Sequence, residues 1–125
     1  MKHFLIFVAM LAGVQGFAQD INILMKEAQN LERTQKETEA LQKYVAVLAQ
    51  DSKNLRALVR ASELSSAIGA RQKDNKDKLN YYQNAKGYAE AALIVDSNNS
   101  DANYVRAVVA GKFTEVETDL SLIHI

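Results

Sequence analysis

The chain carries an internal repeat. Residues 39–54 align in register with residues 84–99, at an offset of 45 residues that places Ala40 opposite Ala85. Identical residues at this offset are the pairs Ala40/Ala85, Ala46/Ala91, Leu48/Leu93, Asp51/Asp96, Ser52/Ser97, Asn54/Asn99 and Ala57/Ala102. Repeats of about this length are typical of units that stack on one another, because one unit cannot bury its apolar face alone. The sequence therefore predicts a repeat architecture.

The composition favours long helices. Hydrophobic residues make up 48% of the chain, charged residues 24%, and Pro is absent. Since Pro breaks helix interiors, its absence fits an all-α fold with uninterrupted helices. Lys and Arg together number 15, as do Asp and Glu, so the net charge is zero. Without a basic field to hold phosphates, we expect no nucleic-acid partner.

The residue types most often used in catalysis are scarce. The chain has no Cys, and its two histidines, His3 and His124, lie close to its two ends. The long middle part therefore lacks the usual general base, the usual nucleophile and the usual zinc ligands. Its acidic residues fall in polar segments that are typical of a solvated surface. We expect no enzyme activity, no cofactor and no metal site.

The first residues have the pattern of a signal peptide. A positively charged start is followed by an apolar run over residues 4–14 and by the small residues Gly16 and Ala18 around Phe17. The apolar run is shorter than the roughly 20 residues that a membrane-spanning helix needs, so a membrane anchor is the less favoured alternative. We predict a signal peptide over residues 1–18 and no membrane span in the mature chain. An Ala-Gln junction resembles exported proteins of Bacteroidetes-type bacteria, which implies a periplasmic or secreted protein.

The last six residues, 120–125, do not continue the pattern before them. We interpret them as the translation of a sequencing adaptor, which makes residues 19–119 a repeat domain that is incomplete at its C-terminus. The alternative is a genuine amphipathic tail. On the first interpretation, the helix from Ala102 to about Gly111 lacks its next partner. Its apolar residues Val105, Val108 and Val109 are then expected to be partly exposed.

Apolar residues recur at helical spacing between the two ends. The first two apolar stripes are formed by Leu24, Ala28 and Leu31, and by Leu41, Tyr44, Val45 and Leu48. The polar segment 34–38 predicts a tight connection between two antiparallel helices, with Thr34 or Thr38 capping the second. Asn54 is expected to cap the third helix, and Gly69 to end it in the left-handed conformation.

Both repeated units resemble tetratricopeptide (TPR) repeats, which are helix-turn-helix units of about 34 residues. The residues at the family's helix-packing positions are Ala40, Tyr44 and Val47 in the first unit and Ala85, Ala89 and Ala92 in the second. Ser52 and Ser97 stand where the family usually has Pro, and the large aromatic residue of the first helix is missing. The resemblance implies a right-handed solenoid of antiparallel helices, about five in number after the signal peptide.

The offset of 45 residues exceeds the usual TPR unit by about 11 residues. We place the excess in the polar segment 70–80, either as a long loop or as extra turns at the start of the fourth helix. Together with this insertion, several segments resemble proteins of the regulator-of-microtubule-dynamics type, including exported bacterial relatives. They are Ala61–Leu64, Ile68–Gly69, Tyr81–Tyr82, Ala102–Ala107 and Gly111–Lys112. This resemblance covers residues 20 to 119 and implies a helical scaffold, without a microtubule role in an exported protein.

In such a scaffold, the first helices of the units line a concave groove. The side chains expected there are Lys26, Gln29, Arg33, Arg56, Arg60, Glu63 and Tyr104. Arg56 and Arg60 lie one helical turn apart and would hold a peptide carboxylate, unless they form ordinary surface pairs with Glu63. Tyr81, Tyr82 and Tyr88 are expected to pack between helices.

We therefore predict a non-catalytic scaffold of the periplasm or cell envelope that binds a protein or peptide partner. The alternative is a docking or regulatory module of an exported enzyme whose catalytic domain follows residue 119.

Overall fold

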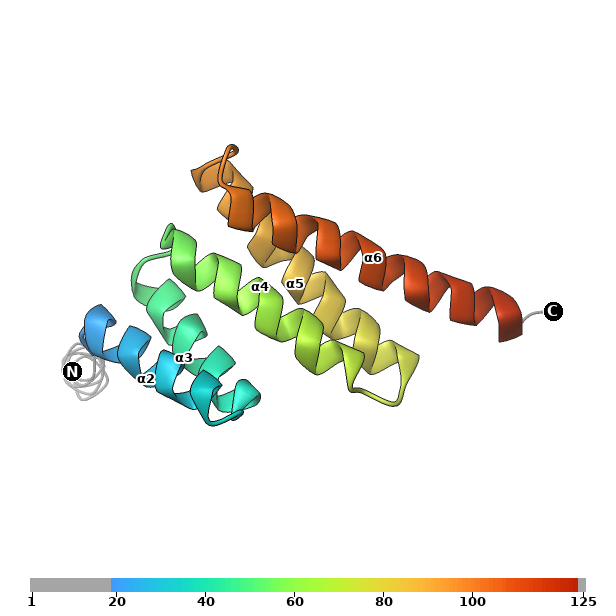
Figure 1. Cartoon of the computed structure of the whole chain (residues 1–125), viewed down its shortest axis with the longest axis horizontal. Coiled ribbons are helices and arrows are strands. Elements are labelled where there is room, and N and C mark those ends of the chain that lie inside the picture. The colour runs from blue at the N-terminus through green and yellow to red at the C-terminus, as the bar shows by residue number, and fades with distance from the viewer. Residues whose placement is uncertain (1–18, 124–125) are drawn as a thin grey trace, which may run out of the picture.

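The computed structural model describes residues 19–123. This part of the chain is all α-helical, without strands, and contains five helices (Figure 1). They are α2 (Ile21–Arg33), α3 (Glu37–Gln50), α4 (Leu55–Ala70), α5 (Asn75–Val95) and α6 (Ser100–Ile123). Each helix packs against the next one in the sequence, and α4 also contacts α6. The all-α fold with stacked neighbouring helices is confirmed, whereas the predicted signal peptide at residues 1–18 lies outside the described residues.

Polar side chains begin most of the helices. Asn54 Oδ1 accepts a hydrogen bond from Ala57 N at 3.0 Å, and its repeat mate Asn99 accepts one from Ala102 N at 2.9 Å. Both bonds satisfy backbone N–H groups that have no partner inside the helix. Asp20 and Asp74 cap α2 and α5 in a similar way. The predicted cap at Asn54 is thus confirmed.

The predicted threonine cap of α3 is wrong. Lys36 occupies the N-cap position of α3 and makes no side-chain capping bond. Thr34 instead ends α2, and its hydroxyl donates back to the carbonyl oxygen atoms of Asn30 and Leu31, both at 3.2 Å. The chain then turns sharply at Gln35, whose φ is 61°. Thr34 is thus used at the end of α2, and Thr38 lies inside the first turn of α3, past the capping position.

The insertion lengthens one helix. Helix α3 has 14 residues and its repeat mate α5 has 21, and the two end at matching positions. The additional residues therefore form two turns at the start of α5, within the segment 75–81. Only residues 71–74 connect α4 to α5. Of the two alternatives for the polar insertion, extra helical turns are the one that the structure shows.

Small residues lie where the helices approach closely. The residues at the six predicted packing positions are all fully buried, namely Ala40, Tyr44, Val47, Ala85, Ala89 and Ala92. At one of these positions the hydroxyl of Ser62 donates a 2.8 Å hydrogen bond to the carbonyl oxygen of Ala85. That bond joins α4 to the backbone of α5 at a position where the side chain of α5 is a methyl group. Tyr82 is buried between helices as expected, while Tyr81 and Tyr88 are half-buried.

Gly69 does not end α4 in the left-handed conformation. No glycine in residues 19–123 has a positive φ, and α4 continues to Ala70. A Cβ atom at Gly69 would lie 2.8 Å from Cβ of Tyr81 and 2.8 Å from Cε1 of Tyr82. The glycine is therefore required by the close contact between α4 and α5 and not by the backbone conformation.

Helix α6 is longer and better covered than expected. It runs to Ile123, past the predicted domain end at residue 119. Val105 and Val109 are 2% and 0% exposed, so the expectation that they are partly exposed is wrong, while Val108 is half-buried. They are covered because α6 packs on both α5 and α4. The interpretation of residues 120–125 as an adaptor stays a prediction, and His124 lies outside the described residues.

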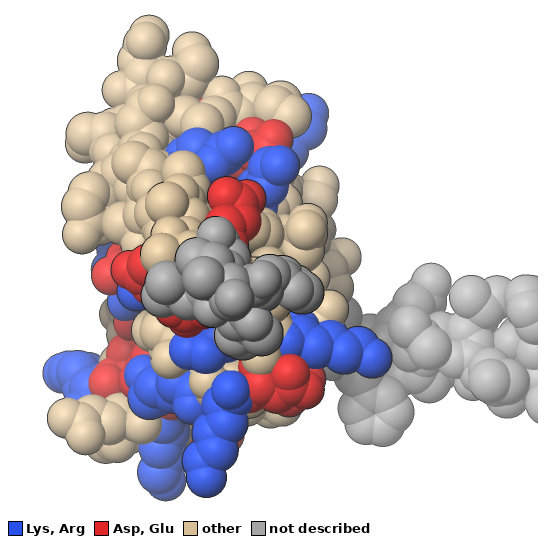
Figure 2. All heavy atoms as spheres, turned by 90° about the vertical axis from the view of Figure 1, so that its right-hand side faces the viewer, with Lys and Arg blue, Asp and Glu red and all other residues tan. Residues whose placement is uncertain are grey.

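Charges of both signs are distributed over the surface. Figure 2 shows the end of the molecule where α6 finishes, with Lys and Arg side chains lying beside Asp and Glu over the lower part of this face. Most of the upper part is uncharged. This mixture matches the net charge of zero.

Candidate functional site

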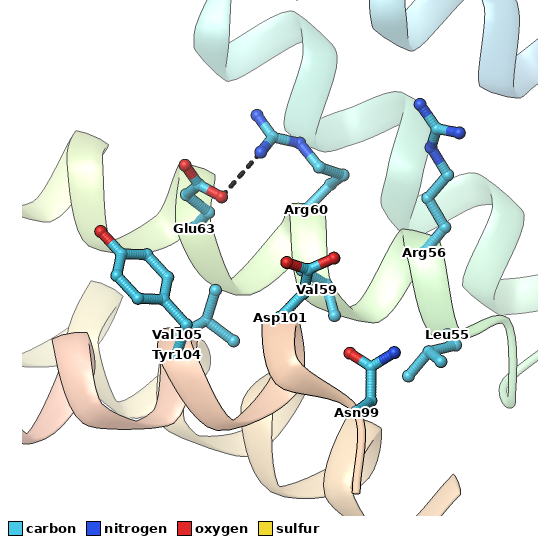
Figure 3. Close-up of a pocket in the computed structure, with 9 residues that line it drawn as sticks. All are labelled: Leu55, Arg56, Val59, Arg60, Glu63, Asn99, Asp101, Tyr104 and Val105. Carbon is cyan, nitrogen blue, oxygen red and sulfur yellow. Dashed lines mark hydrogen bonds and ion pairs between the residues drawn. The ribbon is translucent and has the colours of Figure 1, made fainter. Parts of the chain in front are cut away.

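A cavity of about 390 Å³ lies between α4 and α6 (Figure 3). This main cavity is lined by Leu55, Arg56, Val59, Arg60, Glu63, Asn99, Asp101, Tyr104 and Val105. Four of the predicted groove residues are therefore brought together here, three from α4 and Tyr104 from α6. Apolar side chains form part of its lining and charged ones surround them. Its volume is within the usual range of ligand-binding pockets.

Arg60 is held by two carboxylates. One of its Nη atoms forms an ion pair with Glu63 at 2.7 Å, which Figure 3 shows as a dashed line. Its Nε and other Nη atom bind both carboxylate oxygen atoms of Glu32, which comes from α2. Burial lowers the pKa of Arg60, but the hydrogen bond to Glu32 and the charges of both glutamates outweigh it and raise the pKa overall. Arg60 thus has its charge neutralised within the protein.

Tyr44 completes this cluster from α3. Its ring is fully buried, and its hydroxyl donates a hydrogen bond to Oε2 of Glu32. Burial raises the pKa of Tyr44 to about 12, and the hydrogen bond and negative charge of Glu32 act in the same direction. We call the four residues Glu32, Tyr44, Arg60 and Glu63 the charge cluster. It joins α2, α3 and α4 and supplies the guanidinium of Arg60 with two carboxylates from within the protein.

Arg56 is in a different situation. Its side chain is exposed, and it takes part in none of the ion pairs formed among residues 19–120. In Figure 3 its guanidinium lies apart from that of Arg60, with no dashed line to any neighbour. The structure therefore separates the two predicted carboxylate-binding residues into one that is neutralised and one that is available. Asp101, which sequence reasoning missed, also forms no ion pair among these residues and lies in the same cavity.

The remaining predicted groove residues lie around α2. Gln29 and Arg33 line a more open hollow between α2 and α4, together with Glu32, Tyr44, Arg56 and Arg60. Arg33 is exposed and hydrogen-bonds to the side chain of Asn30. Lys26 is exposed and lines neither this hollow nor the main cavity. The two hollows thus share Arg56 and Arg60, of which Arg56 is the exposed one.

A far cavity of about 210 Å³ continues the main cavity along α4 and α6. It shares three residues with the main cavity, namely Glu63, Tyr104 and Val105, and is completed by Ser66, Ala67, Val108 and Lys112. We call the two cavities together the α4–α6 groove. Ser66 is only 3% exposed, and its hydroxyl has no hydrogen-bond partner among the residues that the structure describes. Sequence reasoning missed Ser66, because a serine on a helix is usually solvated and its burial depends on where α6 lies.

The structure offers no candidate for a metal centre in the described part of the chain, since residues 19–123 hold no group of three or more potential ligand side chains. No helix in that part is both long and apolar enough to span a membrane.

The sequence matches the family model of the regulator of microtubule dynamics protein 1-3 over residues 24–123. The chain belongs to this family. The match covers α3, α4, α5 and α6 in full and α2 from Leu24 onward, so it includes all residues that line the α4–α6 groove. Searches of curated proteins and of solved structures gave no significant match.

Proposed function

We propose that this member of the regulator of microtubule dynamics family is a non-catalytic, TPR-like scaffold that binds the carboxylate end of a peptide in the α4–α6 groove. The observation that carries the proposal is the contrast between two arginines on one helix. Arg60 is neutralised by Glu32 and Glu63, whereas Arg56, beside a partly apolar cavity, forms no ion pair among residues 19–120. A guanidinium binds carboxylates through charge-assisted hydrogen bonds, which are about twice as strong as neutral ones.

The shape of the groove supports a peptide over a compact small molecule. Its two cavities lie in line along α4 and α6, and both are open to solvent on one side. Tyr104 is 64% exposed and belongs to both cavities. An exposed tyrosine offers a rigid, amphipathic surface against which a peptide backbone can lie with little loss of side-chain entropy. A linear ligand would use the whole of this surface.

The test is capture of peptides by the immobilised protein. The probe is a mixture of N-acetylated pentapeptides, used once with free C-terminal carboxylates and once amidated. The free acids should be retained more strongly, and Arg56→Ala should reduce their retention about tenfold or more. Lys26→Ala removes one positive charge from an exposed site outside the groove and serves as the control. Equal retention of acids and amides by the unmodified protein would refute the proposal.

We further propose that the protein is exported and acts in the periplasm or cell envelope. The support is the leader pattern of residues 1–18. The mass of the protein isolated from a periplasmic fraction would test this, because cleavage after Ala18 gives a chain that begins at Gln19. Uncleaved protein in the cytoplasmic fraction would refute it.

A further inference from the structure

The hollow between α2 and α4 has an excess of positive charge. It is lined by Gln29, Glu32, Arg33, Tyr44, Arg56 and Arg60. Three arginines against one glutamate give this lining a net charge of +2. Glu63 binds Arg60 from the main cavity, and counting its charge still leaves a surplus of one positive charge. The hollow therefore favours an anionic ligand.

The carboxylate in this lining does not repel such a ligand strongly. Both carboxylate oxygen atoms of Glu32 bind Arg60, and one of them also accepts the hydrogen bond from Tyr44. The side chain of Glu32 is only 18% exposed. An incoming anion thus meets a carboxylate whose charge is balanced by a guanidinium group.

Arg33 and Arg56 remain available for the ligand. Both side chains are exposed, and neither forms an ion pair within the described part of the chain. Arg33 ends α2 and Arg56 lies in the first turn of α4, so the two come from different helices that line the hollow. In Figure 3 the guanidinium of Arg56 points away from Asp101, as does that of Arg60, which reaches Glu32 on α2. The side chain of Arg56 is therefore oriented toward the α2 side of α4.

The donor groups of the hollow fit the oxygen atoms of a phosphate monoester. A guanidinium group presents its N–H donors in a planar fork that matches phosphate oxygen atoms bidentately. The side-chain amide of Gln29, one turn before Arg33 on α2, offers a further N–H donor. A phosphate monoester carries nearly two negative charges at pH 7, which matches the surplus of the lining.

The size and lining of the hollow favour a small, water-soluble ligand. Its volume of about 490 Å³ holds a phosphate group together with a small organic substituent. None of the six lining residues has an aliphatic side chain, so the hollow is better suited to a water-soluble phosphate than to a lipid tail.

We propose that the hollow between α2 and α4 binds the phosphate group of a water-soluble phosphate monoester between Arg33 and Arg56. Arg56 also borders the main cavity, where the proposed function assigns it to a peptide carboxylate. The two ligands then compete for one guanidinium group, and the phosphate regulates peptide binding. The phosphate site stands independently of the proposed function, whereas the competition rests on it.

The test is a titration of the isotope-labelled full chain with methyl phosphate at neutral pH and low salt, followed by NMR. Backbone amide signals near Arg33 and Arg56 should shift together and give a single dissociation constant. Dimethyl phosphate has one charge fewer and should bind about tenfold more weakly. Succinate, a dicarboxylate of similar charge, should also bind more weakly. Equal binding of either control ligand would refute the assignment of a phosphate monoester.

Three single variants separate a site from a diffuse positive field. Arg33→Ala and Arg56→Ala should each weaken binding of methyl phosphate about tenfold, because each removes charge-assisted hydrogen bonds. Lys26→Ala removes the same charge from an exposed position of α2 that lines neither hollow, and should change binding by less than about twofold. All three side chains are exposed, so the variants should fold, which a thermal melt by circular dichroism checks. An equal effect of Lys26→Ala and Arg33→Ala would overturn the site.

Vesicles distinguish a free phosphate from a lipid headgroup. Phosphatidylcholine vesicles that contain phosphatidic acid present the same phosphate monoester at a membrane surface. The protein should bind methyl phosphate and should not sediment with these vesicles. Sedimentation that depends on Arg33, without any binding of methyl phosphate, would assign the site to a lipid headgroup and refute a water-soluble ligand.

Adding methyl phosphate to the peptide-capture experiment tests the competition. It should release the free-acid peptides from the unmodified protein, whereas Arg33→Ala should keep them, because Arg33 lies outside both cavities of the α4–α6 groove. If methyl phosphate binds but releases no peptide, the competition is refuted and the phosphate site stands. If methyl phosphate does not bind, this inference fails and the proposed function is unaffected. If acids and amides are retained equally while methyl phosphate binds at Arg33 and Arg56, the proposed function fails alone.

Discussion

The two sides of α4 differ in how far their polar groups are satisfied. On the side of α2 and α3, Arg60 is bound by two glutamates, and the buried hydroxyl of Tyr44 donates to one of them. On the side of α6, Asp101 has no ion-pair partner among residues 19–120, and the buried hydroxyl of Ser66 has no hydrogen-bond partner there. Arg56, one turn before Arg60, borders the hollows on both sides of α4 and also forms no ion pair among these residues. Helix α4 thus has a closed side toward α2 and α3, where Arg60 is bound, and an open side toward α6. Polar side chains that have no hydrogen-bond or ion-pair partner therefore indicate a ligand site better than the mere presence of charged side chains does.

The largest effect is expected from breaking the closed side. Glu32→Ala removes the partner of both Arg60 and Tyr44 and leaves a buried hydroxyl unbonded. The free energy of unfolding should fall by about 2 kcal/mol, since hydrogen bonds to charged groups contribute about 1.5–3 kcal/mol. Urea titration followed by circular dichroism measures this. Asp101→Ala on the open side should change the free energy by less than about 0.5 kcal/mol, and an equal effect of the two variants would contradict the comparison.

A smaller effect is expected from ionising the closed side. Burial and the bond to Glu32 raise the pKa of Tyr44 to about 12, above the value of about 10 for an unfolded chain. The folded state thus keeps a proton that the unfolded state loses, so the associated stability is complete below pH 10 and declines as the pH rises through 12. Urea midpoints of the unmodified protein should fall over this range. Tyr44→Phe should show a shallower decline, and identical pH profiles would show that Tyr44 is not responsible.

The smallest effect on stability is expected from Arg56. Because this side chain is exposed and forms no ion pair within the described part of the chain, Arg56→Ala should change the free energy of unfolding by less than about 0.5 kcal/mol. Urea titration of Arg56→Ala and Arg60→Ala side by side measures the contrast. Arg60→Ala should be the more destabilising change, since it leaves Glu32 and Glu63 without their cation. A larger loss for Arg56→Ala would mean that Arg56 belongs to the closed side.

Local features of the fold could be predicted from the sequence. They are the helices, which the apolar spacing and the lack of Pro indicate from neighbouring residues, and the repeat, which the 45-residue offset shows by direct comparison of two segments. Asn54 could be predicted as a cap for the same reason, because capping joins atoms only three residues apart. The predicted cap at Thr34 failed because a threonine hydroxyl can form a hydrogen bond at the end of one helix as well as at the start of the next.

Features that depend on contacts between distant residues could not be predicted. Arg60 and Glu32 are separated by 28 residues, so their pairing requires the relative position of α2 and α4. Gly69 was expected at a helix end because glycine often occupies that position. The reason for a glycine there is instead its close approach to residues of α5, which the sequence does not reveal. The burial of Val105 and Val109 required knowing that α6 rests on two helices at once. Part of the candidate site was therefore predicted, since Arg56, Arg60, Glu63 and Tyr104 do lie together. The pairing of Arg60 with two carboxylates and the presence of Asp101 and Ser66 in the groove were not.

The missing side chain of Gly69 links the packing of three helices. A Cβ atom at this position would lie 2.8 Å from Cβ of Tyr81 and 2.8 Å from Cε1 of Tyr82, and the ring of Tyr82 packs edge-on against the ring of Phe113 on α6, with 6.1 Å between centroids. The hydrogen atom at Gly69 therefore lets one tyrosine of α5 contact α4 and α6 together. A larger residue at Gly69 would have to displace Tyr81 or Tyr82, so a substitution on α4 would disturb the contact between α5 and α6 as well.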